Sequence, residues 1–166
     1  GYSIFDGGSA RDSVPYHLGS EIHRETFSVA SAPNAVQERT LSMSELIPDQ
    51  RPGLYKLGLS LPADYRGATR WVLRTDIGLV AKQEGAGFLV WSNSVRDLQA
   101  LAGVELQLLS VSNQLLGTAR TDAAGLARIP YTGGNEELGG PAMILARSRD
   151  DFSFSFDVRL SDIRIG

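Results

Sequence analysis

The chain has 166 residues, a formal net charge of −3 and no cysteine, and 42% of its residues are hydrophobic. This apolar content is sufficient for the core of one or two small domains, while the lack of cysteine excludes disulfides, thiolate metal sites and a cysteine nucleophile within these residues. The lysines and arginines are dispersed singly, so no basic surface for nucleic acid is predicted, and no run approaches the roughly 20 apolar residues of a membrane-spanning helix.

The first half of the chain passes from an irregular pattern to an extended one. Residues 1–20 have few regularly spaced apolar residues, and we expect them to be irregular. Strands are predicted farther on at Glu25–Ser31, Val36–Leu46, Gly53–Leu61 and Ala68–Thr75. The third is the clearest, because its larger side chains occupy every second position and predict one packed face: Tyr55, Leu57, Leu59 and Leu61. Ser42 and Glu45 have the spacing of a capping box, so a short helical turn at Ser42–Ile47 is the alternative for that segment.

The second half contains six or seven extended segments separated by turns. We predict strands at Ile77–Gln83, Gly87–Ser92, Gly103–Val111, Leu115–Thr121, Leu126–Ile129, Ala142–Ala146 and Phe152–Val158. Hairpin turns are expected at Glu84–Ala86, at Asn113–Gln114 and, most strongly, at Asp122–Gly125, where an aspartate can cap the turn and a glycine can take a positive φ. The uninterrupted apolar run Ala142–Ala146 predicts a strand buried on both sides.

The last segment decides the fold class. Its apolar residues alternate with serine and aspartate in a period of two that no helix fits: Phe152, Phe154, Phe156 and Val158. With alternate side chains pointing inward, Phe154→Ala would cost about 3–5 kcal/mol if the ring is fully buried. Many short strands with no convincing helix predict an all-β fold of two packed antiparallel sheets.

A faint internal repetition predicts tandem modules. Pro52–Leu57 and Gly140–Leu145 each place an apolar strand directly after a turn. We therefore expect a boundary near Thr75–Ile77. Residues 1–75 would form a partial sandwich domain with a poorly structured N-terminal stretch, residues 76–160 a complete sandwich, and residues 161–166 the start of a linker to a next domain.

Several segments together resemble the macroglobulin domains of bacterial α2-macroglobulin-like proteins. The resemblance covers about residues 36–160, and its most specific part is the join Trp71–Leu79 within the segment Trp71–Lys82. The remaining segments are Pro52–Tyr55, Phe88–Trp91, Ala102–Leu108 and Leu116–Ala127. The stretch 103–127 alone is less specific, because secreted sandwiches of the transthyretin and invasin kind share its turn.

The resemblance implies tandem macroglobulin-type, fibronectin III-like sandwiches from a periplasmic protease inhibitor, which can be lipid-anchored. Such inhibitors trap proteases through a bait region and, in many members, a thioester formed by a Cys-x-Glu-Gln motif. This chain has neither part, so the resemblance assigns it a scaffold role. The expected partners are other domains of the parent chain, target proteases and cell-envelope proteins.

No catalytic, cofactor-binding or metal-binding residue is predicted. His17 and His23 are the only histidines, and they lack the third and fourth ligands that a metal site needs. Ser9 lacks the Gly-x-Ser-x-Gly elbow of a nucleophile, and no histidine lies in the second half to act as its base. Gly85-Ala86-Gly87 lacks the rest of a dinucleotide fingerprint and is interpreted as a hairpin turn.

The aspartates and tryptophans each have a functional and a structural interpretation. Turn carboxylates suit calcium, but without the spaced ligands of a binding loop we favour solvated turns for Asp122, Asp150, Asp151 and Asp157. Trp71 and Trp91 could be exposed platforms for a sugar or peptide. Because both lie inside apolar strands, packing in the core or between modules is the favoured prediction.

Three functional hypotheses follow. The leading one is a non-catalytic structural and interaction fragment of a bacterial α2-macroglobulin-like inhibitor. The alternatives are a stalk or adhesion module of a surface protein, which the generic hairpin at Asp122–Gly125 would also fit, and an accessory sandwich of a secreted hydrolase. The parent gene distinguishes them, because only the first requires a downstream bait or thioester region.

Overall fold

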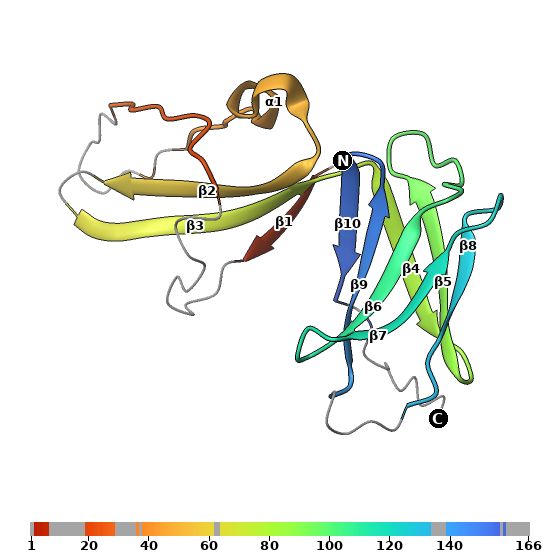
Figure 1. Ribbon diagram of the computed structural model, residues 1–166. Coiled ribbons are helices and arrows are strands. Elements are labelled where there is room, and N and C mark those ends of the chain that lie inside the picture. Colours follow the sequence, from red (N-terminus) through yellow and green to blue (C-terminus); the bar gives the residue numbers. More distant parts are fainter. Residues whose placement is uncertain are drawn as a thin grey trace. The chain divides into compact units, whose positions relative to one another are not determined.

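A computed structural model describes residues 2–6, 19–28, 36, 38–61, 64–133, 139–156 and 158. The chain divides into two compact units, one formed by Gly1–Phe5 with Pro52–Gly166 and the other by Asp6–Arg51. The structure is nearly all β with antiparallel sheets, which confirms the predicted fold class (Figure 1).

The unit Asp6–Arg51 contains two short helices, α1 (Met43–Leu46) and the 3-10 helix η1 (Pro48–Gln50). The helical turn was predicted, but its capping box is wrong: the Ser42 side chain makes no cap bond and instead lies 2.7 Å from the Ser44 hydroxyl. The strand predictions at 25–31 and 36–46 are wrong for all the residues that the structure describes there, because alternation is weak and Val36 is exposed. Residues 29–35 and 37 lie outside the described chain.

A three-stranded sheet has the order β1-β3-β2, with β1 at Tyr2–Asp6, β2 at Gly53–Leu61 and β3 at Asp64–Arg74. β2 and β3 are antiparallel, with Gly53 opposite Arg74 and Leu59 opposite Ala68. The strand β1 corrects the prediction that residues 1–20 are irregular, because this five-residue segment pairs with a strand far away in sequence that local patterning cannot reveal. The expected packed face of β2 is also wrong in part, since Leu59 is 56% exposed.

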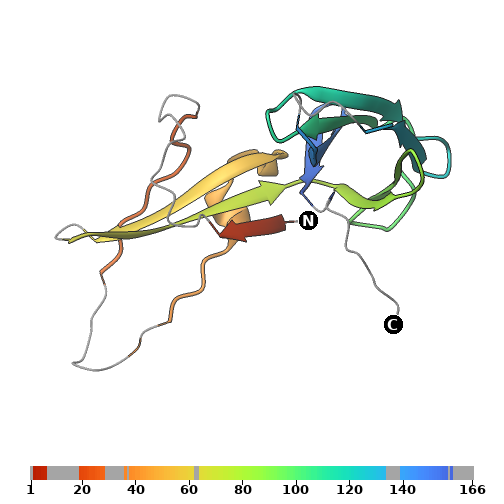
Figure 2. The same ribbon diagram turned by 90° about the horizontal axis from the view of Figure 1, so that it is seen from below.

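Residues 77–158 form a sandwich of two antiparallel sheets. One sheet has the order β4-β5-β8 and the other β10-β9-β6-β7, and Figures 1 and 2 show the two facing each other. The strands are β4 (Ile77–Gln83), β5 (Gly87–Ser94), β6 (Glu105–Ser110), β7 (Leu115–Arg120), β8 (Leu126–Pro130), β9 (Pro141–Ser148) and β10 (Asp151–Ser155). All seven lie where the sequence predicts them, with ends that differ by a few residues.

The core lies between these sheets and follows the period-two alternation. Every second residue of the central strands is fully buried, including Val90, Leu108 and Ile144. Phe88 on β5 anchors the core near Tyr131, with ring centroids 6.1 Å apart. The two sheets come close to each other at both edges of the sandwich. At one edge, the amide of Asp76, the residue before β4, donates to Asp151 Oδ2 on β10 at 2.8 Å. At the other edge, β7 lies so close to β8 that a side-chain carbon on Gly117 would be 2.7 Å from the Pro130 carbonyl oxygen.

Two strands differ from the prediction: β10 turns the other set of alternate side chains toward the core, and β9 is less buried than expected. On β10, Ser153 lies opposite Ala146 and is buried, whereas Phe152 and Phe154 point to the outer face and are half-buried. Phe154 instead packs edge-on against Phe156, with the two ring centroids 5.3 Å apart. On β9 the residues facing the core are buried, but Met143 and Leu145 are only half-buried, so burial on both sides is wrong.

Candidate interaction surface

The outer face of the β4-β5-β8 sheet presents a row of apolar side chains. Val80, Trp91 and Leu126 lie directly opposite one another across the three strands, and directly paired residues share a face. They remain 58%, 43% and 38% exposed, respectively. Trp91 stands on β5, the middle strand, so the row crosses the centre of the sheet. Of the two kinds of packing predicted for Trp91, packing in the core is wrong, because Val90 and Ser92 take the inward positions, and packing between modules stays a prediction.

The loop after β5 is held in place by a hydrogen-bond network around Ser94. The Ser94 hydroxyl donates to Asp76 Oδ1 at 3.1 Å and accepts from the amides of Arg96 and Asp97. The Asp97 carboxylate accepts from the Gln99 amide at 3.0 Å, and this bond, followed by one with Ser94, lowers the pKa of that carboxyl.

The same loop presents Leu98 in an unusual conformation. Leu98 has a φ of +62° and is 73% exposed. A left-handed backbone costs a branched apolar residue about 1–2 kcal/mol. Leu98 therefore combines a strained backbone conformation with a side chain that is largely exposed.

Charges beside the apolar row are largely paired with each other. Arg128 on β8 donates to Glu84 Oε2 at 2.6 Å across the sheet. Lys82 is exposed on the same face, opposite Leu89. Arg128 and Glu84 cancel each other's charge, and Lys82 leaves one positive charge in the row next to the apolar one.

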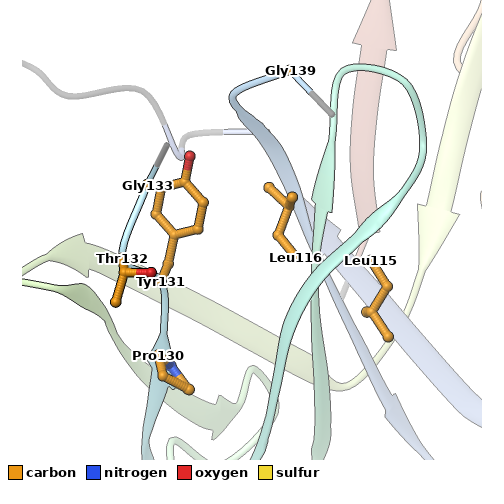
Figure 3. Close-up of a pocket in the computed structure, with 7 residues that line it drawn as sticks. All are labelled: Leu115, Leu116, Pro130, Tyr131, Thr132, Gly133 and Gly139. Atoms are coloured by element: carbon orange, nitrogen blue, oxygen red, sulfur yellow. The ribbon is translucent and has the colours of Figure 1, made fainter. Parts of the chain in front are cut away.

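A shallow hollow of about 230 Å³ lies where β7 begins and β8 ends, at the end of the sandwich away from the loop after β5 (Figure 3). Its lining residues are Leu115, Leu116, Pro130, Tyr131, Thr132, Gly133 and Gly139. They supply one phenol and one hydroxyl but no carboxylate, imidazole or amine. The lining residues therefore supply no carboxylate, imidazole or amine that would activate the Tyr131 phenol or the Thr132 hydroxyl.

Trp71 on β3 lies in a different setting. It is half-buried opposite Lys56 of β2, whose ammonium nitrogen is 5.9 Å from the centre of the indole ring. A cation within about 6 Å of an indole face is attracted by the ring. Trp71 is therefore partly covered by Lys56 but lies outside the sandwich core, so packing in that core is wrong for this residue and packing between modules stays a prediction.

The residues weighed for metal binding and catalysis lie partly outside the described chain. Ser9, His17 and Asp157 lie outside the described chain, and His23 is exposed. Asp122 Oδ1 accepts from the amides of Ala124 and Leu126, both at 2.9 Å, as a turn cap does. Among the described residues, no three of the metal-ligating types histidine, cysteine, aspartate and glutamate are grouped so that they could hold an ion.

The predicted hairpin glycines behave as expected. Gly85 has a φ of +53° between β4 and β5, where the Glu84 amide donates to the Gly87 carbonyl at 2.9 Å. Gly125 has a φ of +73° in the turn that Asp122 caps. None of the helices in the described part of the chain has the length and apolar character needed to cross a bilayer.

Comparison with known proteins gives one family and a set of related structures. The family model described as "Bacterial alpha-2-macroglobulin MG3 domain" matches residues 74–162, which is more than half of the chain. No curated protein sequence matches the chain.

The related structures are of α2-macroglobulin from Escherichia coli. A crystal structure spanning domains NIE-MG1 is similar with a TM-score of 0.64 at 22% identity, covering 78% of this chain and 61% of that one. A second, spanning MG0-NIE-MG1, gives 0.62 at 23% identity and covers 78% of this chain and 41% of that one. This chain thus spans less than two thirds of each of these solved chains. The similarity covers 78% of this chain, and it therefore includes residues outside the sandwich, which makes up about half of the chain. At these identities the likeness shows the fold.

Proposed function

Because the chain belongs to the bacterial α2-macroglobulin family, we propose that it is a non-catalytic structural and interaction module of a broad-spectrum protease inhibitor. The observation that carries this proposal is the match of residues 74–162, which spans the sandwich from the end of β3 to beyond β10. The residues that trap the protease would then lie elsewhere in a longer polypeptide.

Two structural features support a scaffold role. The sandwich core is dense, with Val90, Val104, Leu108, Ile129, Ile144 and Ala146 fully buried. A close-packed interior of this kind transmits strain and resists compression, as a domain that positions others must. In addition, an apolar row remains exposed on the outer face of β4-β5-β8, which favours contact with a further protein surface.

The proposal extends to location and partners. We place the longer protein in the periplasm, where α2-macroglobulin-like inhibitors of bacteria are expected from the resemblance. Its partners would be the other domains of the same polypeptide, target proteases and envelope proteins, and the net charge of −3 disfavours nucleic acid. Cell fractionation with an antibody against residues 77–158 tests the location.

The function is tested by comparing the isolated chain with the product of its complete gene. Both are titrated against a protease acting on a protein substrate, and residual activity is measured at increasing molar ratio. We expect stoichiometric inhibition by the complete product and none by the chain, because a scaffold module has no trap of its own. Inhibition by the chain alone, or no inhibition by the complete product, contradicts the proposal.

A destabilising variant ties the result to this module. Leu108 is fully buried on β6, so Leu108→Ala in the complete product weakens the sandwich by about 2–5 kcal/mol. Leu115→Ala, at a residue that is more than half exposed on the adjacent β7, is the matched control. If the module supports the inhibitor, Leu108→Ala lowers the temperature at which inhibition is lost, and Leu115→Ala leaves that temperature near that of the unchanged protein.

A further inference from the structure

We propose that the outer face of the β4-β5-β8 sheet is the surface on which an adjoining domain of the same polypeptide packs, with Trp91 at the centre of the contact. We call this surface, formed by Val80, Trp91, Leu126 and Val95, the Trp91 surface. The proposal rests on the proposed function, which supplies the longer polypeptide.

A glycine on β4 leaves room beside the row for the side chains of Asn93 and Val95. Val80, Trp91 and Leu126 form one row, and Gly78 precedes Val80 on the same face of β4, opposite Asn93. A side-chain carbon on Gly78 would lie 3.0 Å from both Asn93 Oδ1 and Val95 Cγ1. The missing side chain therefore lets Val95, which is itself exposed, lie against β4 and extend the row toward the loop.

This surface is presented rigidly. β5 is hydrogen-bonded on both sides, to β4 and to β8, and Figure 1 shows it between them. The following loop is tied to Asp76 through Ser94, which is itself buried, and the Val95 amide donates to the Asp76 carbonyl oxygen at 2.9 Å. An aromatic anchor on a fixed support loses little conformational freedom on binding, as the central residues of binding interfaces do.

The charge pattern determines the chemistry of the occupant. Glu84 and Arg128 at the edge of the surface satisfy each other, and the central row contains no charged residue. Lys82 lies in the next row, opposite Leu89, but a charged group placed over the central row would be desolvated without gaining an opposite charge in that row. The occupant must therefore present an uncharged, largely apolar surface.

The size of the surface favours a tethered domain over a second copy. The four side chains leave on the order of 200–400 Å² accessible, against the roughly 800 Å² per partner that a stable complex between free proteins buries. A domain joined by a short linker meets the surface at an effective concentration in the millimolar range, on the order of what a small contact needs. The neutral Trp91 surface is thus suited to an intramolecular neighbour.

The other outer face of the sandwich does not offer the same contact. There Phe152, Phe154, Met143 and Leu145 are already half-buried, and Phe154 and Phe156 pack edge-on against each other. Phe156, which is 59% exposed, lies just past the end of β10, whereas the exposed Trp91 indole stands on the middle strand of its sheet.

Hydroxyl-radical footprinting with mass spectrometry tests the proposal residue by residue. The oxidation rate of Trp91 is measured in the 166-residue chain and in the complete gene product. We expect severalfold slower oxidation in the complete product, because the adjoining domain excludes solvent from the indole. Equal rates in the two proteins overturn the proposal. Protection that rises with concentration in the isolated chain also overturns it, because the occupant is then a second copy.

A variant pair separates docking from folding. Trp91→Ser leaves the thermal midpoint of the isolated chain near that of the unchanged chain, because the indole is largely outside the core. In the complete product it raises the oxidation rate of Leu126 to the rate seen in the isolated chain. Leu115→Ser, at the opposite end of the sandwich, leaves the Leu126 rate unchanged. If Trp91→Ser does not change that rate either, the proposal fails, even where protease inhibition is intact and the proposed function stands.

Discussion

The sandwich and the strand β2 both carry side chains that alternate along their strands, but at residues 53–60 of β2 this alternation gives no fully buried side chain, whereas in the sandwich it does. Phe88 on β5 is 1% exposed because the β10-β9-β6-β7 sheet faces it, whereas Leu59 on β2 remains mostly exposed. Alternation thus predicts a strand, and burial requires a second layer opposite that strand. The difference teaches that a period of two locates strands more reliably than it locates a core.

The largest expected effect tests this comparison directly. Phe88→Ala removes a fully buried ring from the centre of the core, and we expect it to lower the free energy of unfolding by about 3–5 kcal/mol. The lost contacts include the neighbouring ring of Tyr131. Chemical denaturation followed by circular dichroism measures the change.

Leu59→Ala is the matched change in the hairpin. Since Leu59 is largely exposed, its truncation should alter stability by no more than about 0.5 kcal/mol. A loss comparable to that of Phe88→Ala would show that β2 has a covering layer and would remove the distinction between the two regions.

A second prediction sharpens the comparison by locating what fixes the sandwich outside its core. Gly125 has a φ of +73°, and a side-chain carbon there would lie 2.3 Å from the Ser92 carbonyl oxygen. Gly125→Ala therefore adds backbone strain to a clash with the main chain of β5, and we expect a loss on the order of 2–4 kcal/mol in thermal or chemical unfolding.

Gly85 provides the control for that strain. Its φ of +53° is also left-handed, but no atom lies within 4 Å of the position of an added side-chain carbon. Gly85→Ala should cost only the backbone term of about 1–2 kcal/mol. Equal losses at the two glycines would mean that the close approach of the turn to β5 contributes nothing.

The third prediction concerns the carboxylate that closes the same turn. Asp122→Ala removes the acceptor of two backbone amides, those of Ala124 and Leu126, and we expect a loss of about 1–2 kcal/mol. Asp122→Asn keeps an oxygen in the same place and should recover most of the loss. If asparagine is as damaging as alanine, the charge rather than the hydrogen bonds stabilises the turn.

The sequence predicts the strands of the sandwich well because each lies between strong turn signals. The Asp122–Gly125 turn is an example, since a capping oxygen and a left-handed glycine are both local features. It is harder to predict which side chains of a strand face the core where both sets of alternate residues are apolar or nearly so. Trp91 follows Phe88, Leu89 and Val90, and only the pairing with Val80 and Leu126 shows that it points outward.

The same limit explains the candidate surface and the missed strand. Ser153 rather than Phe154 faces the core because the chain register sets Ser153 opposite Ala146. Register depends on contacts between distant segments, as does the pairing that recruits Tyr2–Asp6 into the β1-β3-β2 sheet. The Trp91 surface could therefore not be assigned from the sequence, although the residues that form it stand out as large and apolar.

The smallest expected effect is a titration in the loop that continues the Trp91 surface. The Gln99 amide donates to the Asp97 carboxylate, and this bond across Leu98 lowers the pKa of that carboxyl in the folded chain. A folded pKa below the unfolded one means that the bond contributes stability above the unfolded pKa and loses it as the pH falls through the folded pKa.

Carboxyl NMR of the folded chain should show Asp97 titrating at lower pH than in urea, with the Leu98 amide signal moving in step. Asp97→Asn keeps the acceptor oxygen, so its Leu98 signal should be insensitive to acid over that range. If Asp97 titrates identically in the folded and unfolded chains, the carboxylate does not hold Leu98 in its left-handed conformation, and the strain there must be supported by the Ser94 network alone.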